Sequence, residues 1–353
     1  MEKLLWYALG LLISWAALIW VRSRRYRQAI WLLLSYALYV TWGGWSLSIL
    51  LFSSLVNYGL GKFLRRRTSQ SRLWMGVAFN VLLLGTFKYL PAFAHSLPAG
   101  SALGSLNKTP LGASFWTFQA LSYLFDIYRQ EELDPSLLEF CLYMAFWPTV
   151  ISGPICRLPN LLPQFRRNAW PSWEDYAAGA RRVCVGFLML GIAELLASGL
   201  APGQGINAGF ARMPAQWSGA DVWLLLIGYG FQLFFDFAGY SHLVIGAARL
   251  FGIELAENFD RPYLASTPSV FWTRWHMSLS FWIRDYVFLP LASASPSLWW
   301  RNLSLLIAMI LFGLWHKGSI LYIVWGAYHG MLLVLHRQWQ QLYRRARMEL
   351  SSL

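Results

Sequence analysis

Long apolar runs follow one another along nearly the whole chain, and they restrict its possible folds more than any other feature. Runs of spanning or near-spanning length occur at about 4–20, 28–42, 45–61, 73–91, 112–128, 136–152, 180–200, 220–235, 237–253, 303–315 and 319–336. A helix needs about 20 residues to cross a bilayer, and fewer where other helices surround it. The pattern therefore predicts an all-α protein that crosses a membrane many times.

The composition agrees with this prediction. Hydrophobic residues make up 57% of the chain and charged residues 13%, whereas a soluble protein carries about 25% charged residues. The chain also has 21 Trp and 17 Tyr, whose rings settle at membrane interfaces. These numbers exclude an ordinary water-soluble domain.

The net charge of +13 comes mostly from short basic clusters between the apolar runs. Such clusters lie at 22–27, 62–67, 165–167 and 344–349. They are typical of cytoplasmic loops, and they attract the anionic headgroups of membrane lipids. No nucleic-acid recognition motif accompanies the charge, so we expect membrane lipid as a partner and no nucleic acid.

The positions of the basic clusters predict the topology. Clusters after the first and third runs place both loops in the cytoplasm and the N-terminus outside, while the basic tail after residue 336 places the C-terminus inside. Opposite termini require an odd number of crossings, so nine or eleven are expected. The first run lacks a cleavage site before its basic cluster, which favours a retained first helix.

Three segments do not fit simple spans. Residues 91–112 are rich in Gly, Pro and Ser and read as an external loop, 153–175 contain four prolines, and 254–301 mix aromatic, basic and acidic residues. Irregular backbone at membrane depth occurs only where it is buried in protein or lines a cavity. We therefore expect re-entrant elements around a polar interior, within a single domain spanning 1–353.

Ionisable residues inside apolar stretches are candidates for function. Residues 271–291 contain Arg274, His276, Arg284 and Asp285, and His316 and His329 lie in the aromatic stretch 312–330. The adjacent Arg284 and Asp285 admit two interpretations. They anchor a re-entrant helix through buried hydrogen bonds, or Arg284 helps to steer an anionic donor or to shape the cavity.

Metal and serine chemistry find little support in the sequence. Zinc helices place two His four residues apart, whereas His329 and His336 are seven apart, and neither His276 nor His316 has a near partner. No G-x-S-x-G element surrounds a serine such as Ser241. We expect no bound metal, which leaves a buried histidine acting as general base on a hydroxyl.

Five stretches, in order, resemble the membrane-bound O-acyltransferase (MBOAT) family, and in particular its bacterial branch. They are "SFWTFQALSYLFDIYR" at 114–129, "FWPTVISGPICR" at 146–157, "FFDFAGYSHLVIGAARLFGI" at 234–253, "ENFDRPYLASTPSVFWTRWHMSLSFWIRDYVFLPL" at 257–291 and "FGLWHKGSILYIVWGAYHG" at 312–330. The resemblance implies a bundle of about 9–11 transmembrane helices with re-entrant helices around a central tunnel. It divides the chain into peripheral helices at 1–110, a family core at 111–336 and a basic cytoplasmic tail at 337–353.

The resemblance also assigns site residues. The family's invariant histidine matches His316, which is then the general base, and a second polar position matches His276, 40 residues earlier. His276 and Trp275 are expected to line the tunnel and orient the donor. The residues further expected to bind substrate are Arg284, Asp285, Trp315, Lys317, Asn258 and Tyr240. Lys317 departs from the small residue that the family has after its histidine. If it is close to the base it opposes protonation of His316, and the alternatives are that it faces an interface or meets an anionic acceptor.

The implied function is transfer of a short acyl group, acetyl first, to a hydroxyl of an extracytoplasmic glycan or acceptor protein. The donor is a cytoplasmic thioester, acyl-CoA or an acyl carrier protein, and no cofactor is bound. We expect a multi-pass protein of the bacterial cytoplasmic membrane that works with an extracytoplasmic partner acyltransferase or acceptor. The alternatives are D-alanyl transfer from a carrier-protein thioester to an envelope polymer, and a small-solute transporter.

Overall fold

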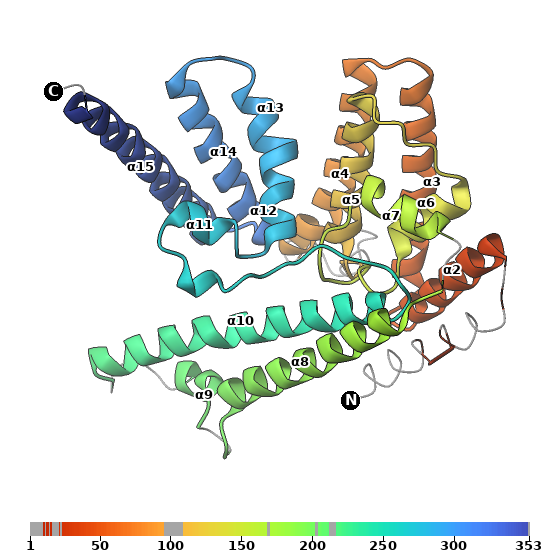
Figure 1. The fold of residues 1–353 in the computed structure, drawn as a ribbon, viewed down its shortest axis with the longest axis horizontal. Helices are drawn as coiled ribbons and strands as arrows, with labels where there is room; N and C mark the ends of the chain where they lie inside the picture. The colour runs from red at the N-terminus through yellow and green to blue at the C-terminus, as the bar shows by residue number, and fades with distance from the viewer. Residues whose placement is uncertain are drawn as a thin grey trace. The chain divides into compact units, whose positions relative to one another are not determined.

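The computed structural model describes residues 10, 12, 13, 15, 21, 23–94, 109–167, 170–201, 204–211 and 217–351. Within these ranges the regular structure is entirely helical and contains no strand, which confirms the expected all-α class (Figure 1). The first apolar run at 4–20 lies largely outside the described residues, as does most of the loop at 91–112, including His95.

The chain forms two compact units, each assembled from separate segments. The first unit comprises Met1–Arg66, Pro110–Ala120 and Glu132–Glu257. The second comprises Arg67–Thr109, Leu121–Glu131 and Asn258–Leu353. Helix α5 (Ala113–Tyr128) begins in the first unit and ends in the second. The single domain expected from the sequence stays a prediction.

The first unit is built from helices of the N-terminal and central parts of the chain. Its helices are α2 (Arg24–Val40), α3 (Gly44–Arg66), α6 (Leu137–Ala145), α7 (Leu158–Arg166), α8 (Trp173–Ser198), α9 (Ile206–Ala211) and α10 (Gly219–Arg249). Helices α6, α8 and α10 begin with the same capping box, in which a serine and an acidic residue three positions later satisfy each other's backbone N–H groups. In the described part of the proline-rich segment at 153–175, residues 158–166 form the short helix α7 and residues 173–175 begin α8, so the segment is not one continuous span.

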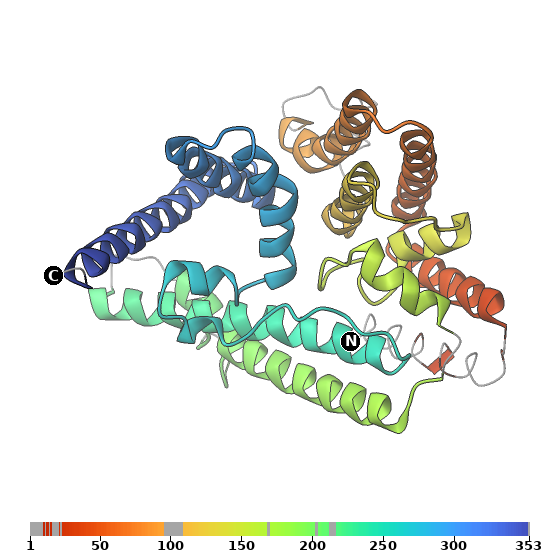
Figure 2. The same cartoon turned by 45° about the horizontal axis from the view of Figure 1, so that its top comes forward.

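Helices α8 and α10 pack as a close antiparallel pair and lie side by side in both views (Figures 1 and 2). Glycines make this approach possible. A Cβ at Gly186 would lie 2.8 Å from the Gly239 carbonyl oxygen, and a Cβ at Gly246 would lie 2.8 Å from that of Gly179. Small residues at facing positions are typical of helix pairs in membranes.

The core of the first unit is built around α6, which is almost wholly buried. The Tyr143 hydroxyl donates to the carbonyl oxygens of Gln119 and Cys156, both at 3.1 Å. The backbone N–H of Trp147 donates to the Ser35 hydroxyl at 3.1 Å. These buried polar groups are paired, as stability in a low-dielectric interior requires.

The second unit holds the segment that carries most of the ionisable residues noted above. Its elements are α4 (Gln70–Ala94), the 3₁₀ turn η3 (Pro262–Leu264), α11 (Pro268–Trp272), α12 (Met277–Ile283), the π-helix η4 (Arg284–Phe288), α13 (Leu289–Ala292), α14 (Leu298–His316) and α15 (Ile320–Ser351). Helices α14 and α15 are an antiparallel pair in close contact at Gly313 and Gly326, where an added Cβ would collide with the facing backbone.

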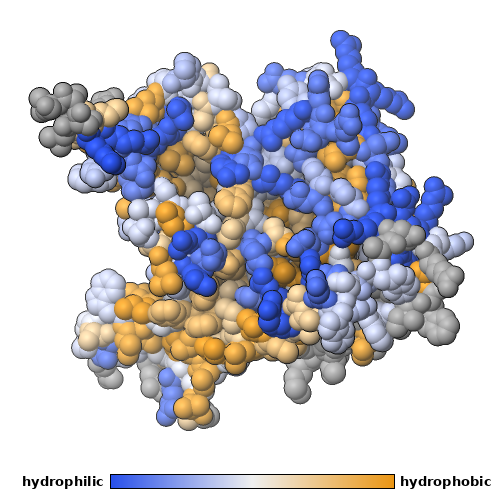
Figure 3. Space-filling model, in the orientation of Figure 1, coloured by the Kyte–Doolittle hydropathy of each residue, from blue (hydrophilic) through white to orange (hydrophobic). Residues whose placement is uncertain are grey.

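Three described helices, α3, α10 and α14, are long and apolar enough to cross a membrane. The runs at 220–235 and 237–253, expected as separate elements, form the single helix α10 because Asp236 between them does not interrupt backbone hydrogen bonding. Large apolar side chains such as Trp223 (66% exposed) and Leu224 (72%) cover α10, and this apolar surface is visible in Figure 3. The number of crossings and the re-entrant arrangement stay predictions.

Candidate active site

The segment between residues 258 and 292 of the second unit is a chain of short helices rather than a span. His276 lies between α11 and α12 with a left-handed backbone (φ 41°) and caps α12. A residue with a side chain rarely adopts this conformation, and such residues concentrate at functional sites. The backbone at this position therefore aims the imidazole in a way that a continuous helix would not.

The side chain of His276 is held by Asn258. The distance from His276 Nδ1 to Asn258 Oδ1 is 3.0 Å, and the same amide oxygen accepts the Ser278 hydroxyl at 2.8 Å. Asn258 is fully buried, and His276 is 3% exposed. Because an amide oxygen only accepts, Nδ1 carries the proton and Nε2 keeps its lone pair.

His316, the last residue of α14, lies among aromatic rings. Its ring centroid is 4.9 Å from that of Phe312, 4.6 Å from Trp315, 5.9 Å from Tyr322 and 5.6 Å from Trp325. Unlike His276, it remains exposed. The rings restrict the imidazole's orientation while leaving it accessible.

The fold brings the two histidines together. They are far apart in sequence, yet His316 lies close enough to act electrostatically on His276. One imidazole is buried and oriented by an amide, and the other is accessible. This combination of a fixed and an open ring is the main geometric feature of the site.

Helix α4 adds a cation that was not among the residues predicted from the sequence. The Lys88 ammonium lies 4.5 Å from the centroid of the Trp315 ring and acts electrostatically on His316. The neighbouring Tyr89 hydroxyl donates to the Leu314 carbonyl oxygen at 2.8 Å. Lys88 lies within the apolar run at 73–91, so the rule that ionisable residues in such runs mark functional sites would have found it.

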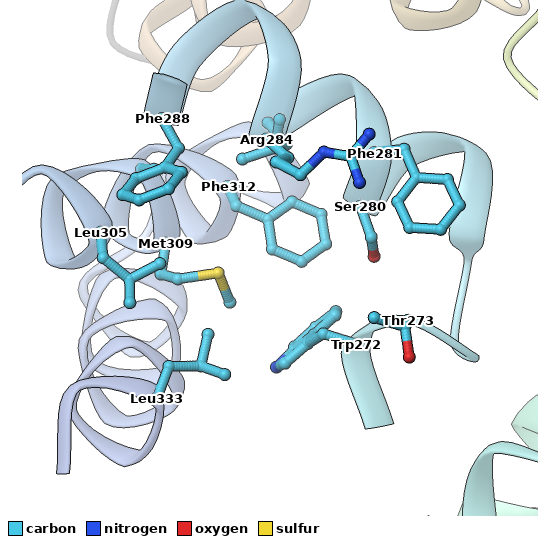
Figure 4. A pocket seen from close by; sticks show the side chains of 12 residues that line it. Trp272, Thr273, Ser280, Phe281, Arg284, Phe288, Leu305, Met309, Phe312 and Leu333 are labelled. Carbon is cyan, nitrogen blue, oxygen red and sulfur yellow. The ribbon is translucent and has the colours of Figure 1, made fainter. Parts of the chain in front are cut away.

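A cavity of about 200 Å³ lies in the same unit. Its wall is mostly aromatic and aliphatic, and Figure 4 shows side chains from several helices around it. The lining includes Trp272, Phe281, Arg284, Phe288, Met309 and Phe312. Because the Phe312 ring also contacts His316, one aromatic side chain separates the cavity from this histidine.

The π-helix η4 is held by polar contacts from the end of α5. The Tyr286 hydroxyl donates to Asp126 Oδ1 at 2.7 Å, and both side chains are buried. Arg129 donates to the Asp285 carbonyl oxygen at 2.6 Å, and its guanidinium lies 5.0 Å from the Tyr286 ring centroid. Single π-helical turns are frequent at functional sites, and these contacts fix this one beside the cavity.

Arg284 and Asp285 form the expected adjacent pair. Arg284 Nε lies 2.6 Å from Asp285 Oδ1 and Nη2 lies 3.2 Å from Oδ2. Arg284 is exposed and lines the cavity. Both interpretations from the sequence remain compatible with this geometry, because the pair lies next to the anchored π-helix and also presents a guanidinium to the cavity.

The other predicted site residues occupy different surroundings. Trp275 packs against Phe259, Tyr263 and Phe271, with ring centroids 5.1, 5.8 and 5.7 Å away, so its ring is fixed by neighbours. Lys317 is exposed just after α14. Tyr240 belongs to α10 of the first unit, and its role stays a prediction.

Among the described residues, no three His, Cys, Asp or Glu side chains gather closely enough to hold a metal ion.

The chain is similar to a known protein family and to several known proteins. The model of the membrane-bound O-acyltransferase family matches residues 61–351. The chain is 33% identical to a probable alginate O-acetylase of Pseudomonas aeruginosa, over 91% of this chain and 62% of the relative. It is 30% identical to a peptidoglycan O-acetyltransferase of Helicobacter pylori, over 90% of this chain and 66% of the relative. It is also 30% identical to a teichoic acid D-alanyltransferase of Bacillus subtilis, over 84% of this chain and 75% of the relative.

Proposed function

The chain belongs to the membrane-bound O-acyltransferase family, and we propose that it transfers an acetyl group from a cytoplasmic thioester donor to a hydroxyl of an extracytoplasmic glycan or acceptor protein. The observation that carries this proposal is the pair of histidines, with an accessible His316 beside a buried His276 that Asn258 orients. The chain spans about 62% of the length of the alginate relative, so the activity of the whole protein is part of the proposal.

In the proposed reaction His316 is the general base. Its imidazole takes the proton of the acceptor hydroxyl as the oxygen attacks the thioester carbonyl carbon. A C–O bond forms, the C–S bond breaks, and the thiolate leaves with the proton that His316 returns. The aromatic rings around His316 restrict its orientation, and the thioester is activated enough for positioning and one base to suffice.

Lys88 and His276 support this step. A tetrahedral intermediate places negative charge on the former carbonyl oxygen, and a fixed cation nearby stabilises it. Lys88 is suited to this role because its ammonium lies over Trp315 and acts on His316. His276, with Nδ1 bound to Asn258, presents Nε2 to the reaction path and orients the donor.

The cavity is proposed to receive the acyl end of the donor. Its wall is apolar apart from a few groups, and Phe312, one of its lining residues, also contacts His316. About 200 Å³ is enough room for a short acyl chain and part of its carrier arm. Arg284 on the wall then meets the anionic portion of acyl-CoA or a carrier protein, while its pairing with Asp285 holds the guanidinium in place.

D-alanyl transfer from a carrier-protein thioester is the second candidate. It uses the same base and the same thioester chemistry, and the Bacillus subtilis relative has this name. Acetyl transfer is favoured because the alginate relative matches with higher identity (33% against 30%) and over more of this chain (91% against 84%). Either reaction places the protein in a bacterial cytoplasmic membrane and needs an extracytoplasmic acceptor or partner.

Mass spectrometry of the cell envelope tests the proposal. Glycans and exported proteins are compared between cells with and without the chain, at equal cell density. The proposal predicts O-acetyl esters that appear only with the chain. D-alanyl esters would select the second candidate, and an unchanged envelope together with altered uptake of a small solute would contradict transferase activity.

A further inference from the structure

A second and larger cavity lies in the first unit and has no part in the proposed reaction. Its volume is about 830 Å³, and it is formed by the start of α2, the end of α3 and the start of α6. Unlike the apolar cavity near His316, it is lined by charged and polar side chains. The charged lining residues are Arg24, Arg25, Lys62, Asp134, Glu139 and Arg166.

The acidic residues of this wall already have basic partners. Arg166 Nε lies 2.9 Å from Glu139 Oε1, and Arg65 forms an ion pair with Asp134. The positive charge that remains comes from Arg24 and Arg25 on the first turn of α2 and from Lys62 on α3. All three side chains are exposed, and Lys62 lies 5.4 Å from the ring centroid of Tyr58. The cavity therefore presents a net positive wall to an anion.

The N-terminus of α2 adds to the positive electrostatic potential of this wall. Its N-cap, Ser23, makes no side-chain capping bond, and its first turn contains no acidic residue. The first N–H groups of a helix point outward and favour negative charge. Arg24 and Arg25, the first two residues of α2, both line the cavity.

The position of the cavity at the end of a candidate span leads us to expect it at the depth of lipid headgroups. Helix α3 is one of the candidate membrane spans, and Lys62 lies in its last two turns, before Arg65 and Arg66. Earlier on α3, Phe52 and Leu55 are 50% and 54% exposed, as expected for a surface that contacts acyl chains. A basic pocket at the end of a span is a common site for an anionic headgroup. Figure 3 shows polar side chains gathered in the region of α2 and α6.

We propose that this cavity binds the phosphate group of an anionic phospholipid, with Arg24, Arg25 and Lys62 around the phosphate and the acyl chains along α3. A free phosphate compound has the same recognition chemistry. The lipid is favoured because the charged wall adjoins an apolar candidate span. The bound lipid ties α2, α3 and α6 together at one membrane interface.

Native mass spectrometry of the purified full chain in detergent tests the site. The probes are phosphatidylglycerol, phosphatidylcholine and soluble glycerol phosphate. The test variant is Arg24→Gln/Arg25→Gln/Lys62→Gln. The control, Arg66→Gln/Arg67→Gln/Arg347→Gln, removes the same charge from exposed positions outside the cavity. Circular dichroism checks that each variant is folded.

We expect one phosphatidylglycerol to bind the unchanged chain and the control variant about 10-fold more tightly than it binds the test variant. The variant Arg24→Lys/Arg25→Lys/Lys62→Arg keeps the charge and should keep the binding. Equal binding to test and control variants would overturn the site. If glycerol phosphate shows the 10-fold difference and the lipid does not, the phosphate site stands and the lipid as its occupant is wrong.

Discussion

The imidazole of His276 and the side-chain amide of Asn258 form a buried hydrogen bond of 3.0 Å between Nδ1 and Oδ1. Eighteen residues separate them in the chain, and a backbone bond from Met277 N–H to the Asn258 carbonyl oxygen, at 2.9 Å, joins the same segments. The side-chain bond determines which imidazole nitrogen keeps its lone pair. The backbone bond holds the segments together independently of the Asn258 side chain, so the two contributions can be separated experimentally.

Replacing Asn258 tests the orientation of His276. In Asn258→Ala the imidazole loses its acceptor, and we expect turnover to fall about 10- to 100-fold because a small misplacement of a reacting group has this effect. Asn258→Asp keeps an oxygen in place and should retain more activity. Steady-state acyl transfer with varied donor measures the effect. Equal losses of turnover and of folded protein in both variants would indicate a purely structural amide.

We compare the effects of replacing two lysines: Lys88, whose ammonium lies near His316, and Lys317, which follows His316 in the sequence. Lys88→Met removes the cation near His316 and Trp315, so we expect turnover to fall about 10- to 100-fold with little change in donor KM. Lys88→Arg should recover part of the rate. Lys317→Met serves as the matched control, and a larger loss there than in Lys88→Met would reverse the assignment.

Ala308 tests the role of the cavity, because it is 1% exposed and part of the lining. Ala308→Leu adds volume to the wall, so the ratio of propionyl to acetyl transfer should fall about 10-fold. Ala308→Gly should leave the ratio equal or raise it. Competition between the two thioesters in one reaction measures the ratio directly. An unchanged ratio in folded Ala308→Leu would remove the cavity from the acyl path.

Glu139 links the stability of the first unit to pH. Burial alone would raise its pKa, but hydrogen bonds from Arg166 and Ser136 prevail and lower it to about 2. The stabilisation is therefore fully present above the unfolded pKa near 4 and disappears as pH falls towards 2. We expect Glu139→Gln to cost about 1–2 kcal/mol at neutral pH, allowing for the exposed Arg166.

Thermal unfolding of the detergent-solubilised chain between pH 3 and pH 7 measures this difference. The gap between the midpoints of Glu139→Gln and the unchanged chain should be constant above about pH 5 and shrink below about pH 4. Glu174→Gln, an exposed substitution at the start of α8, is the control. A gap that does not vary with pH would contradict the electrostatic origin of the effect.

The sequence predicted the fold class and two of the candidate spans, but it did not predict all the contacts that assemble the site. The runs at 45–61 and 303–315 correspond to α3 (Gly44–Arg66) and α14 (Leu298–His316), because length and apolarity alone determine a span. The association of His276 with His316 came from family resemblance. The contact of Lys88 with Trp315 depends on how α4 packs against α14, and no local pattern encodes that packing.

The role of His316 as the general base is tested most directly by measuring His316→Ala beside His329→Ala. Both histidines lie among aromatic rings of the second unit, so the pair controls for the loss of a packed imidazole. With equal amounts of folded protein in the membrane, we expect His316→Ala to lower acyl transfer about 1,000-fold and His329→Ala to stay within about 10-fold of the unchanged chain. Transfer by His316→Ala at a rate equal to that of the unchanged chain would contradict the assignment of His316 as the base.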